Sequence, residues 1–369
     1  MKKIIGFFTG ARSDYGLTKR LLKMIQNDNF FELRIYVSGM HLLEKFGNTY
    51  EEIESDNFKI FKKIYTYNNV HDKKSEFTNS VNLIYDSIID DCIDCAYIVG
   101  DRIEAYSAAL ALHFCKTPIF HYAGGQITKG AVDNIYRYNI TNLSTLHFAT
   151  VKSAFERLAE YPLVEKKNLH FTGSTAIDSI FEFLKSPVEI KKYFPELKGS
   201  NYALMTFHSA TNSNENICET MKFSINRIIS ANYKVLITYP NNDQGSKEII
   251  DLINTYKYDK NIVIVKNLTS EKYYSAIKGS KFVIGNSSSG IIEVPYFNKT
   301  TINIGSRQDG RDFDNTIIDC SINIDELEKV FELGFNTNWR SIKPDLKYGA
   351  GDSSIKILNI MKNYFNENK

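Results

Sequence analysis

The sequence predicts an α/β protein built from two Rossmann-like, doubly wound domains that face a cleft. The chain has 369 residues, which is too long for one ordinary hydrophobic core. Short apolar runs alternate with segments of helical periodicity, and the alternation starts again after residue 200. Two domains of about 150 to 200 residues each account for these observations.

The first half opens with an apolar run over Lys3–Phe8, a turn at Gly10 and a helical pattern over Tyr15–Ile25. This order is typical of half a βαβ unit. Four more short buried strands followed by a turn and a helical segment are expected at Leu33–Ser38, Ala96–Val99, Pro118–Tyr122 and Leu146–Thr150. Strands that alternate with helices in this way predict a parallel sheet.

A helical stretch over Ile177–Leu184 precedes a charged, Pro-containing segment, which is the best candidate for a linker. We therefore expect an N-terminal domain over 1–185 and a C-terminal domain over 186–369, whose last helix could pack back on the N-terminal domain. Strands of the second half are expected at Ala203–Phe207, Val235–Tyr239, Ile262–Val265, Phe282–Gly285 and Thr300–Ile304.

The composition indicates a globular protein without a polyanionic partner. Hydrophobic residues make up 43% of the chain, and 45 Lys and Arg balance 43 Asp and Glu to a net charge of +2. This balance predicts neither a nucleic-acid nor a membrane surface. Five cysteines, the lack of a secretory leader and the lack of an apolar stretch of 18 residues favour a soluble, cytoplasmic protein.

The loop Gly285-Asn286-Ser287-Ser288-Ser289-Gly290 joins a predicted strand to a helical segment. Small residues there let backbone N–H groups and hydroxyls approach a phosphate at the positive end of a helix. We therefore expect an anion site at Ser287, Ser288, Ser289 and Gly290, with a Ser-rich helix cap as the structural alternative. Glu293, about one turn further on, could accept hydrogen bonds from a ribose diol, or its charge could simply complement the helix dipole.

Groups suited to acid/base chemistry also follow predicted strands, where ligands bind in open parallel sheets. Asp101, Glu104 and Asp133 supply carboxylates, although each could merely cap a helix. His208 follows the strand at Ala203–Phe207, where a neutral imidazole could act as an acid or base or stabilise a leaving diphosphate.

Three arginines could bind phosphate through a bidentate guanidinium: Arg12, Arg307 and Arg311. Surface charge is the alternative for Arg307 and Arg311. Asn241 follows the strand at Val235–Tyr239 and joins this set of candidate binding residues. The turn at Gly10 does not have the GxGxxG spacing, so we expect no NAD site.

Eleven segments taken together point to a known family. They are Thr9 to Gly16, Ser38-Gly39-Met40-His41, Phe46-Gly47-Asn48-Thr49, Gly100-Asp101-Arg102-Ile103-Glu104, Gly124-Gly125, Gly130-Ala131-Val132-Asp133, Ile140 to Ser144, Phe207-His208, Thr238 to Asp243, Gly285 to Glu293 and Asn303 to Gln308. In these segments the chain resembles, nearly end to end, the UDP-N-acetylglucosamine 2-epimerase family, and in particular its hydrolysing bacterial branch.

The resemblance implies a GT-B-like pair of Rossmann domains, commonly a homodimer or homotetramer, that needs no metal and no NAD. The substrate would be a UDP-sugar. A carboxylate removes the C2 proton while the diphosphate leaves C1, and water then adds to the 2-acetamidoglycal with inversion at C2. The products would be UDP and N-acetylmannosamine, for sialic acid or a related nonulosonate. The resemblance places His208 at the leaving group and makes Asp133 the first and Asp101 the second choice for the proton-transferring group.

The chain departs from the branch at three positions in its sugar half. Gln126 stands where the branch has Glu, Tyr138 where it has His, and Lys129 where an acidic residue is common. An amide cannot serve as a proton-transfer base. Gln126 therefore joins the candidate catalytic residues as a substrate-binding group, or the substrate differs from UDP-N-acetylglucosamine and could carry a second acetamido group or a GDP leaving group.

Two other functions fit the same sequence. A GT-B glycosyltransferase would share both domains and the diphosphate site but pass the sugar to an acceptor. A nucleotide-sugar binding protein without catalytic activity would explain the changes at Gln126 and Tyr138.

Overall fold

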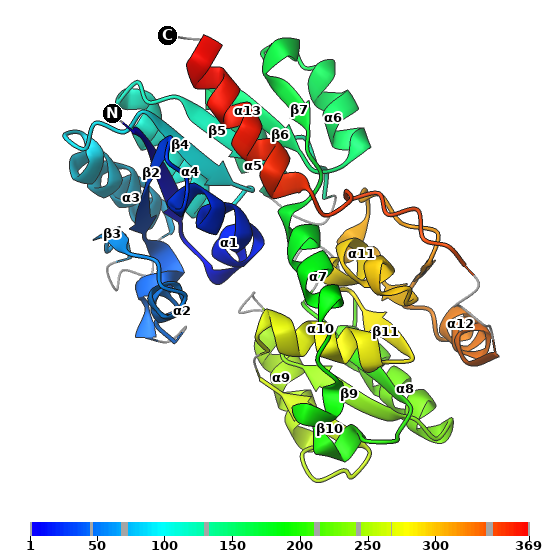
Figure 1. Cartoon of the computed structure of the whole chain (residues 1–369). Helices are drawn as coiled ribbons and strands as arrows, with labels where there is room; N and C mark the ends of the chain where they lie inside the picture. Colours follow the sequence, from blue (N-terminus) through cyan, green and yellow to red (C-terminus); the bar gives the residue numbers. More distant parts are fainter. Residues whose placement is uncertain are drawn as a thin grey trace. The chain divides into compact units, whose positions relative to one another are not determined.

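Two parallel sheets organise the chain, each with helices connecting its strands (Figure 1). The computed structural model describes residues 2–44, 47–67, 73–128, 133–209, 215–240, 245–266, 268–336 and 342–367. The described chain divides into two compact units, the first comprising Met1–Gln126, Val132–Ser179 and Tyr348–Lys369, and the second Ile127–Ala131 and Ile180–Lys347. The predicted fold class of two doubly wound α/β domains is confirmed.

The first unit contains a seven-stranded sheet in the order β3-β2-β1-β4-β5-β6-β7. Its strands are β1 (Lys3–Thr9), β2 (Phe31–Val37), β3 (Ile60–Lys63), β4 (Cys95–Val99), β5 (Ile119–Tyr122), β6 (Leu146–Ala149) and β7 (Leu169–Phe171). Its helices are α1 (Arg12–Gln26), α2 (Tyr50–Ser55), α3 (Lys73–Ile88), α4 (Ile103–Phe114), α5 (Asp133–Leu143), α6 (Lys152–Ala159) and α13 (Ser353–Glu367), with the start of α7 (Thr175–Lys185).

The second unit contains a six-stranded parallel sheet in the order β10-β9-β8-β11-β12-β13. Its strands are β8 (Tyr202–Thr206), β9 (Lys234–Thr238), β10 (Ile262–Val265), β11 (Phe282–Gly285), β12 (Thr301–Ile304) and β13 (Ile317–Cys320). Its helices are α8 (Ile217–Ser230), α9 (Ser246–Thr255), α10 (Ser270–Gly279), α11 (Ser288–Ile292) and α12 (Ile324–Asn336).

All ten strands expected from the sequence are present, and three more lie at sheet edges. The central strands β4, β8 and β11 are buried along their whole length, as continuous apolar runs in a parallel sheet should be. The additional strands β3, β7 and β13 are three or four residues long and partly exposed. Their sequences therefore lack the apolar runs that predict the other strands.

The last helix, α13, belongs to the first unit and packs beside α1 (Figure 1). Its residues Ile357, Met361 and Phe365 join the core of the first sheet. The carboxylate of Asp178 caps its first turn, accepting from the backbone N–H of Ser353 at 3.0 Å and of Ser354 at 2.6 Å. We expected the boundary near residue 185. The two units divide between residues 179 and 180, inside α7.

Strand order reverses direction once in each sheet. The first sheet grows from β1 towards β2 and β3 on one side, and from β4 towards β7 on the other. The second sheet grows in the same way from β8 and β11. Ligands of doubly wound sheets bind beyond the carboxyl ends of the strands at such switch points. Among the described residues, no helix has the length and apolar character needed to cross a bilayer.

Candidate functional site

Strands β8 and β11 come very close together at their carboxyl ends, at the switch point of the second sheet, just before the loop that follows β11. Gly285 has a φ of +135°, and a Cβ on it would lie 1.9 Å from the carbonyl oxygen of Thr206 at the end of β8. A side chain at this position is therefore excluded by both space and backbone conformation. The glycine brings the two loops that follow β8 and β11 together.

Asn286, which is fully buried, ties these two loops to each other. Its Oδ1 accepts from the backbone N–H of His208 at 2.7 Å, and its Nδ2 donates to the carbonyl oxygen of His208 at 2.9 Å. Its own carbonyl oxygen accepts from Arg307 Nη1 at 3.1 Å and from Gln308 Nε2 at 2.9 Å. One asparagine thus holds the predicted His208 and Arg307 in a single cluster.

His208 is neutral in this cluster. Burial, together with the positive charge of Arg307, lowers the pKa of the imidazole to about 3. At neutral pH its ring can therefore donate one hydrogen bond and accept one, while Arg307 supplies the positive charge. This division of roles suits a group that contacts a leaving diphosphate beside a cation.

The serines of the loop form a chain of hydroxyls at the start of α11. Ser287 is the N-cap residue, and its Oγ lies 3.0 Å from Oγ of Ser289, which in turn lies 2.5 Å from the hydroxyl of Tyr273 on α10. Ser288, which lies between Ser287 and Ser289 in the sequence, is half-buried. Thr301 Oγ1 donates to the carbonyl oxygen of Gly290 at 2.6 Å and fixes the turn against β12.

Glu293 ends α11, and burial raises its pKa to about 7. Because the folded state favours the protonated carboxyl, the stability associated with this group is fully present below pH 4.5 and is lost as the pH rises through 7. Glu293→Gln should therefore be about 3 kcal/mol more stable than the wild type at about pH 8 and nearly equally stable at about pH 4.5, as measured by urea unfolding. An equal stability difference at both pH values would contradict this account.

Two more predicted residues of the second unit, Arg307 and Arg311, lie in the loop that follows β12. Arg307 contacts Asn286, and the backbone N–H of Arg311 donates to the carbonyl oxygen of Gln308 at 3.2 Å. Ser306 donates its backbone N–H to Glu215 Oε1 at 2.9 Å. Asn241 and Lys129 lie outside the described residues.

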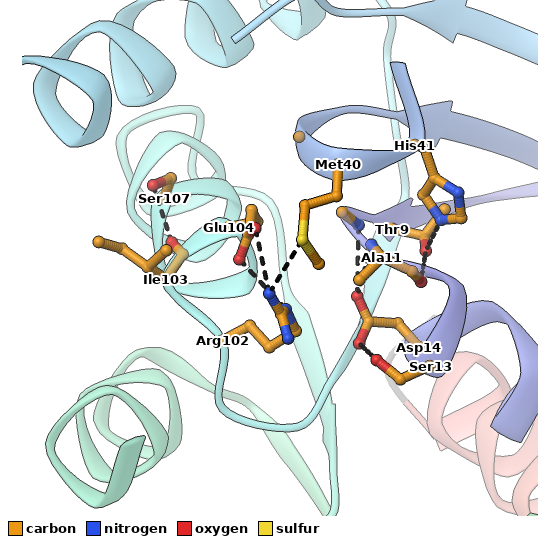
Figure 2. A network of polar contacts seen from close by, with 12 residues as sticks. Thr9, Ala11, Ser13, Asp14, Met40, His41, Arg102, Ile103, Glu104 and Ser107 are labelled. Carbon is orange, nitrogen blue, oxygen red and sulfur yellow. Dashed lines mark hydrogen bonds and ion pairs between the residues drawn. The ribbon is translucent and has the colours of Figure 1, made fainter. Parts of the chain in front are cut away.

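In the first unit, the turn after β1 is organised by Asp14 (Figure 2). Its Oδ2 accepts from the backbone N–H groups of Gly10 at 3.3 Å and Ala11 at 3.1 Å, which caps α1. Burial raises the pKa of Asp14 to about 6. Arg12, the first residue of α1, forms an ion pair with Glu52 at 2.9 Å and is partly exposed.

Glu104 is buried in the same network, between the turns that follow β1 and β2 (Figure 2). Its Oε1 accepts from the hydroxyl of Tyr67 at 2.8 Å, and its Oε2 lies 3.3 Å from Nε of Arg102. Its side chain packs directly against Gly10 and Gly39. In this position the carboxylate of Glu104 pairs with the guanidinium of Arg102.

This packing leads to a test at Gly10. A Cβ on Gly10 would lie 2.5 Å from Cβ of Glu104, so Gly10→Ala should destabilise the protein by roughly 1 to 3 kcal/mol in urea unfolding. Gly16→Ala is the matched control, because a Cβ on Gly16 would meet no atom within 4 Å and alanine favours a helix, so this variant should be slightly stabilised. Equal stabilities of the two variants would contradict the packing of Glu104 against Gly10.

A second cluster of the first unit gathers around Arg137 of α5, whose side chain is only 3% exposed. Arg137 Nη2 forms an ion pair with Asp101, which follows β4, and Nη1 donates to the carbonyl oxygen of Gln126 at 2.6 Å. The Gln126 side chain donates to Thr150 Oγ1 at 2.5 Å. Asp133 begins α5 one turn before Arg137, and side chains four residues apart share a helix face.

The structure therefore brings Asp101, Gln126 and Arg137 together in the first unit, and His208, Arg307 and the serine loop together in the second. Sequence reasoning did not assign roles to the residues that hold each cluster: Asp14, Tyr67, Arg137, Tyr273 and Asn286. A usable signal existed for two of them. Arg137 lies four residues after Asp133, and Asp14 directly precedes the helical pattern predicted at Tyr15–Ile25, where a carboxylate can cap the first turn.

Comparison with known proteins places this arrangement in a family. The profile of the family described as UDP-N-acetylglucosamine 2-epimerase matches residues 23–362. The chain belongs to this family. It is therefore a nucleotide-sugar 2-epimerase by class, as the resemblance predicted.

Two relatives of this epimerase are similar over most of their length. The GDP/UDP-N,N'-diacetylbacillosamine 2-epimerase (hydrolyzing) of Campylobacter jejuni is 34% identical over 90% of this chain and 87% of its own length. The UDP-N,N'-diacetylbacillosamine 2-epimerase (hydrolyzing) of Legionella pneumophila is 29% identical over 98% of this chain and 96% of its own.

The fold of this epimerase matches solved structures of the family. The UDP-GlcNAc 2-epimerase of Neisseria meningitidis superimposes with a TM-score of 0.84 at 18% identity, over 98% of this chain and 100% of that chain. This likeness confirms the GT-B-like class of the fold.

Proposed function

We propose that this epimerase hydrolyses a nucleoside-diphosphate 2-acetamido sugar and releases the nucleoside diphosphate together with the free, C2-inverted sugar. The observation that carries the proposal is the hydrolysing activity named for both relatives, each aligned over most of this chain. The ion pair of Asp101 with buried Arg137, and the position of Asp133 one helical turn before Arg137 on α5, support it.

The chemistry requires two proton-transferring groups. Inversion at C2 means that a proton leaves one face of the sugar and another arrives at the opposite face. We assign removal of the C2 proton to Asp133 and the second transfer to Asp101, whose carboxylate is oriented by Arg137. Gln126, an amide held by Thr150, would bind the sugar without transferring a proton.

The second unit supplies groups that suit the departing diphosphate. The C2 proton is weakly acidic because C2 is a saturated carbon that bears an amide nitrogen and no carbonyl group, so stabilising the leaving group should provide much of the rate enhancement. We assign this role to Arg307, neutral His208 and the hydroxyls of Ser287 and Ser289. Arg12, Ser288, Arg311 and Asn241 are proposed to contact the diphosphate, and Glu293 the ribose.

For the sugar, we propose a 2,4-diacetamido-2,4,6-trideoxy hexose on UDP or GDP, as named for the two relatives. UDP-N-acetylglucosamine, the substrate in the family's description, is the second candidate, which would yield N-acetylmannosamine for sialic acid synthesis. The Gln126 and Tyr138 departures favour the first candidate, because both change the sugar half. Tyr138 packs against Tyr161 with ring centroids 5.5 Å apart.

The experiment is to incubate the protein separately with the two sugars on UDP and to measure free UDP by ion-exchange chromatography. Faster release from the diacetamido sugar supports the proposal, whereas release from UDP-N-acetylglucosamine alone would contradict it. Transfer of sugar to an added acceptor without release of free sugar would indicate a glycosyltransferase. Binding without any release would indicate a nucleotide-sugar binding protein.

We also propose that the protein is a homodimer or homotetramer in the cytoplasm. Light scattering on the purified protein tests the oligomeric state, and cell fractionation tests the location.

A further inference from the structure

His121 lies in β5 and is fully buried in the first unit. Its Nε2 lies 2.8 Å from the carbonyl oxygen of Gly100, and its Nδ1 lies 3.2 Å from Oγ1 of Thr141 on α5. A carbonyl oxygen can only accept, so Nε2 carries the hydrogen and Nδ1 is an acceptor that faces the Thr141 hydroxyl. Burial lowers the pKa of His121 to about 4, so the ring remains neutral in this tautomer near pH 7.

These contacts close a ring around the acid/base cluster. Gly100 directly precedes Asp101, which is paired with Arg137. Thr141 lies one helical turn after Arg137. Its Oγ1 also lies 3.0 Å from the carbonyl oxygen of Arg137, so its single hydroxyl hydrogen is shared between that oxygen and Nδ1 of His121. The path therefore runs from His121 through Gly100 to Asp101, on to Arg137 and Thr141, and back to His121.

The ring fixes the direction of one carboxylate. The carbonyl of Gly100 belongs to the peptide unit that leads into Asp101, so a hydrogen bond to it sets the plane of that peptide. The same imidazole is attached through Thr141 to the helix that carries Arg137, the partner of the carboxylate. The His121 side chain, in a buried strand, therefore holds both the backbone that leads into Asp101 and the helix that carries its ion-pair partner Arg137.

We propose that His121 is a positioning residue that sets the orientation of the Asp101 carboxylate through this ring. The inference rests on the proposed function, in which Asp101 transfers a proton to or from C2. His121 does not contact the substrate in this role. Its effect on the reaction passes through Gly100 and Thr141.

Two conservative substitutions separate the two arms of the ring. The amide nitrogen of glutamine can reach the position of Nε2, and that of asparagine the position of Nδ1. His121→Gln should therefore keep the bond to Gly100 and retain kcat within about fivefold, whereas His121→Asn should lose it. A displaced catalytic group costs about 100-fold, so kcat of His121→Asn should fall by about that factor with KM nearly unchanged.

His147 provides the matched control. It lies opposite His121 in the neighbouring strand β6 and is 2% exposed. Among the described residues, its Nδ1 has no hydrogen-bond partner, and the contacts that form the ring do not involve it. His147→Gln and His147→Asn should lower the melting temperature as the His121 variants do, but leave kcat unchanged.

A second readout does not depend on turnover. The guanidinium of Arg137, held by Asp101 and the Gln126 carbonyl, should give slowly exchanging ¹⁵N resonances that persist in His121→Gln and broaden in His121→Asn. Loss of kcat and of these resonances in His121→Asn alone supports the proposal. Unchanged kcat and resonances in His121→Asn would overturn it. If the wild type releases no diphosphate, the proposed function fails and the resonances alone decide the role of His121.

Discussion

Replacing Asp133 with asparagine should reduce both release of the nucleoside diphosphate and exchange of the C2 proton by about 10² to 10⁴-fold. Asparagine keeps the size and the polar character of the side chain but cannot accept the C2 proton, and general acid/base catalysis contributes a factor of this order. The rate of diphosphate release and the incorporation of deuterium at C2 are measured on the same sample by proton NMR.

Asp86→Asn is the charge-matched control, because Asp86 is exposed on α3 and belongs to neither cluster. It should retain the wild-type rate. A full rate of exchange in Asp133→Asn would show that Asp133 is not the base. Loss of exchange in Asp101→Asn together with that result would transfer the role to Asp101, the carboxylate paired with Arg137.

Replacing Asn286 with leucine should weaken the binding of the nucleotide. The substitution leaves the buried backbone N–H and carbonyl oxygen of His208 without their partner, which should lower the free energy of unfolding by roughly 2 to 5 kcal/mol. UDP affinity should fall by about 10- to 100-fold, because the side chain of Asn286 holds the loop that carries His208. Urea unfolding and isothermal titration calorimetry measure the two effects.

Asn303→Leu is the control for Asn286→Leu. Asn303 is also fully buried in the second unit, where its Nδ2 donates to Asp319 at 2.7 Å. The variant should lose stability but keep UDP affinity. An equal loss of affinity in both variants would mean that destabilisation of the unit, rather than the position of His208, accounts for weaker binding.

The sequence was sufficient to predict the central strands of each sheet and the edge strand β10, but not the other three edge strands. Strands such as β4 and β8 are buried along their whole length, so continuous apolar runs in the sequence predict them. The edge strand β13 is partly exposed along three of its four residues, and β7 has only three residues. Short half-exposed strands have the composition of loops, and only pairing with a neighbouring strand identifies them.

For the site, the sequence predicted which loops lie beyond the carboxyl ends of the strands, because these ends meet at the switch point of a parallel sheet. It could not predict how side chains from distant segments pair. Asp101 and Arg137 are 36 residues apart, and Asn286 and His208 are 78 apart. Such contacts depend on the register of whole strands, and this register is set by packing of the sheet rather than by local sequence.

The most direct test of the account is the reaction in deuterated water with a nucleoside-diphosphate 2-acetamido sugar, followed by proton NMR. We expect release of the nucleoside diphosphate together with a free sugar that is inverted and fully deuterated at C2. Release of a sugar that keeps both its configuration and its proton at C2 would contradict the account, because simple hydrolysis at C1 needs neither Asp133 nor Asp101 to act on C2.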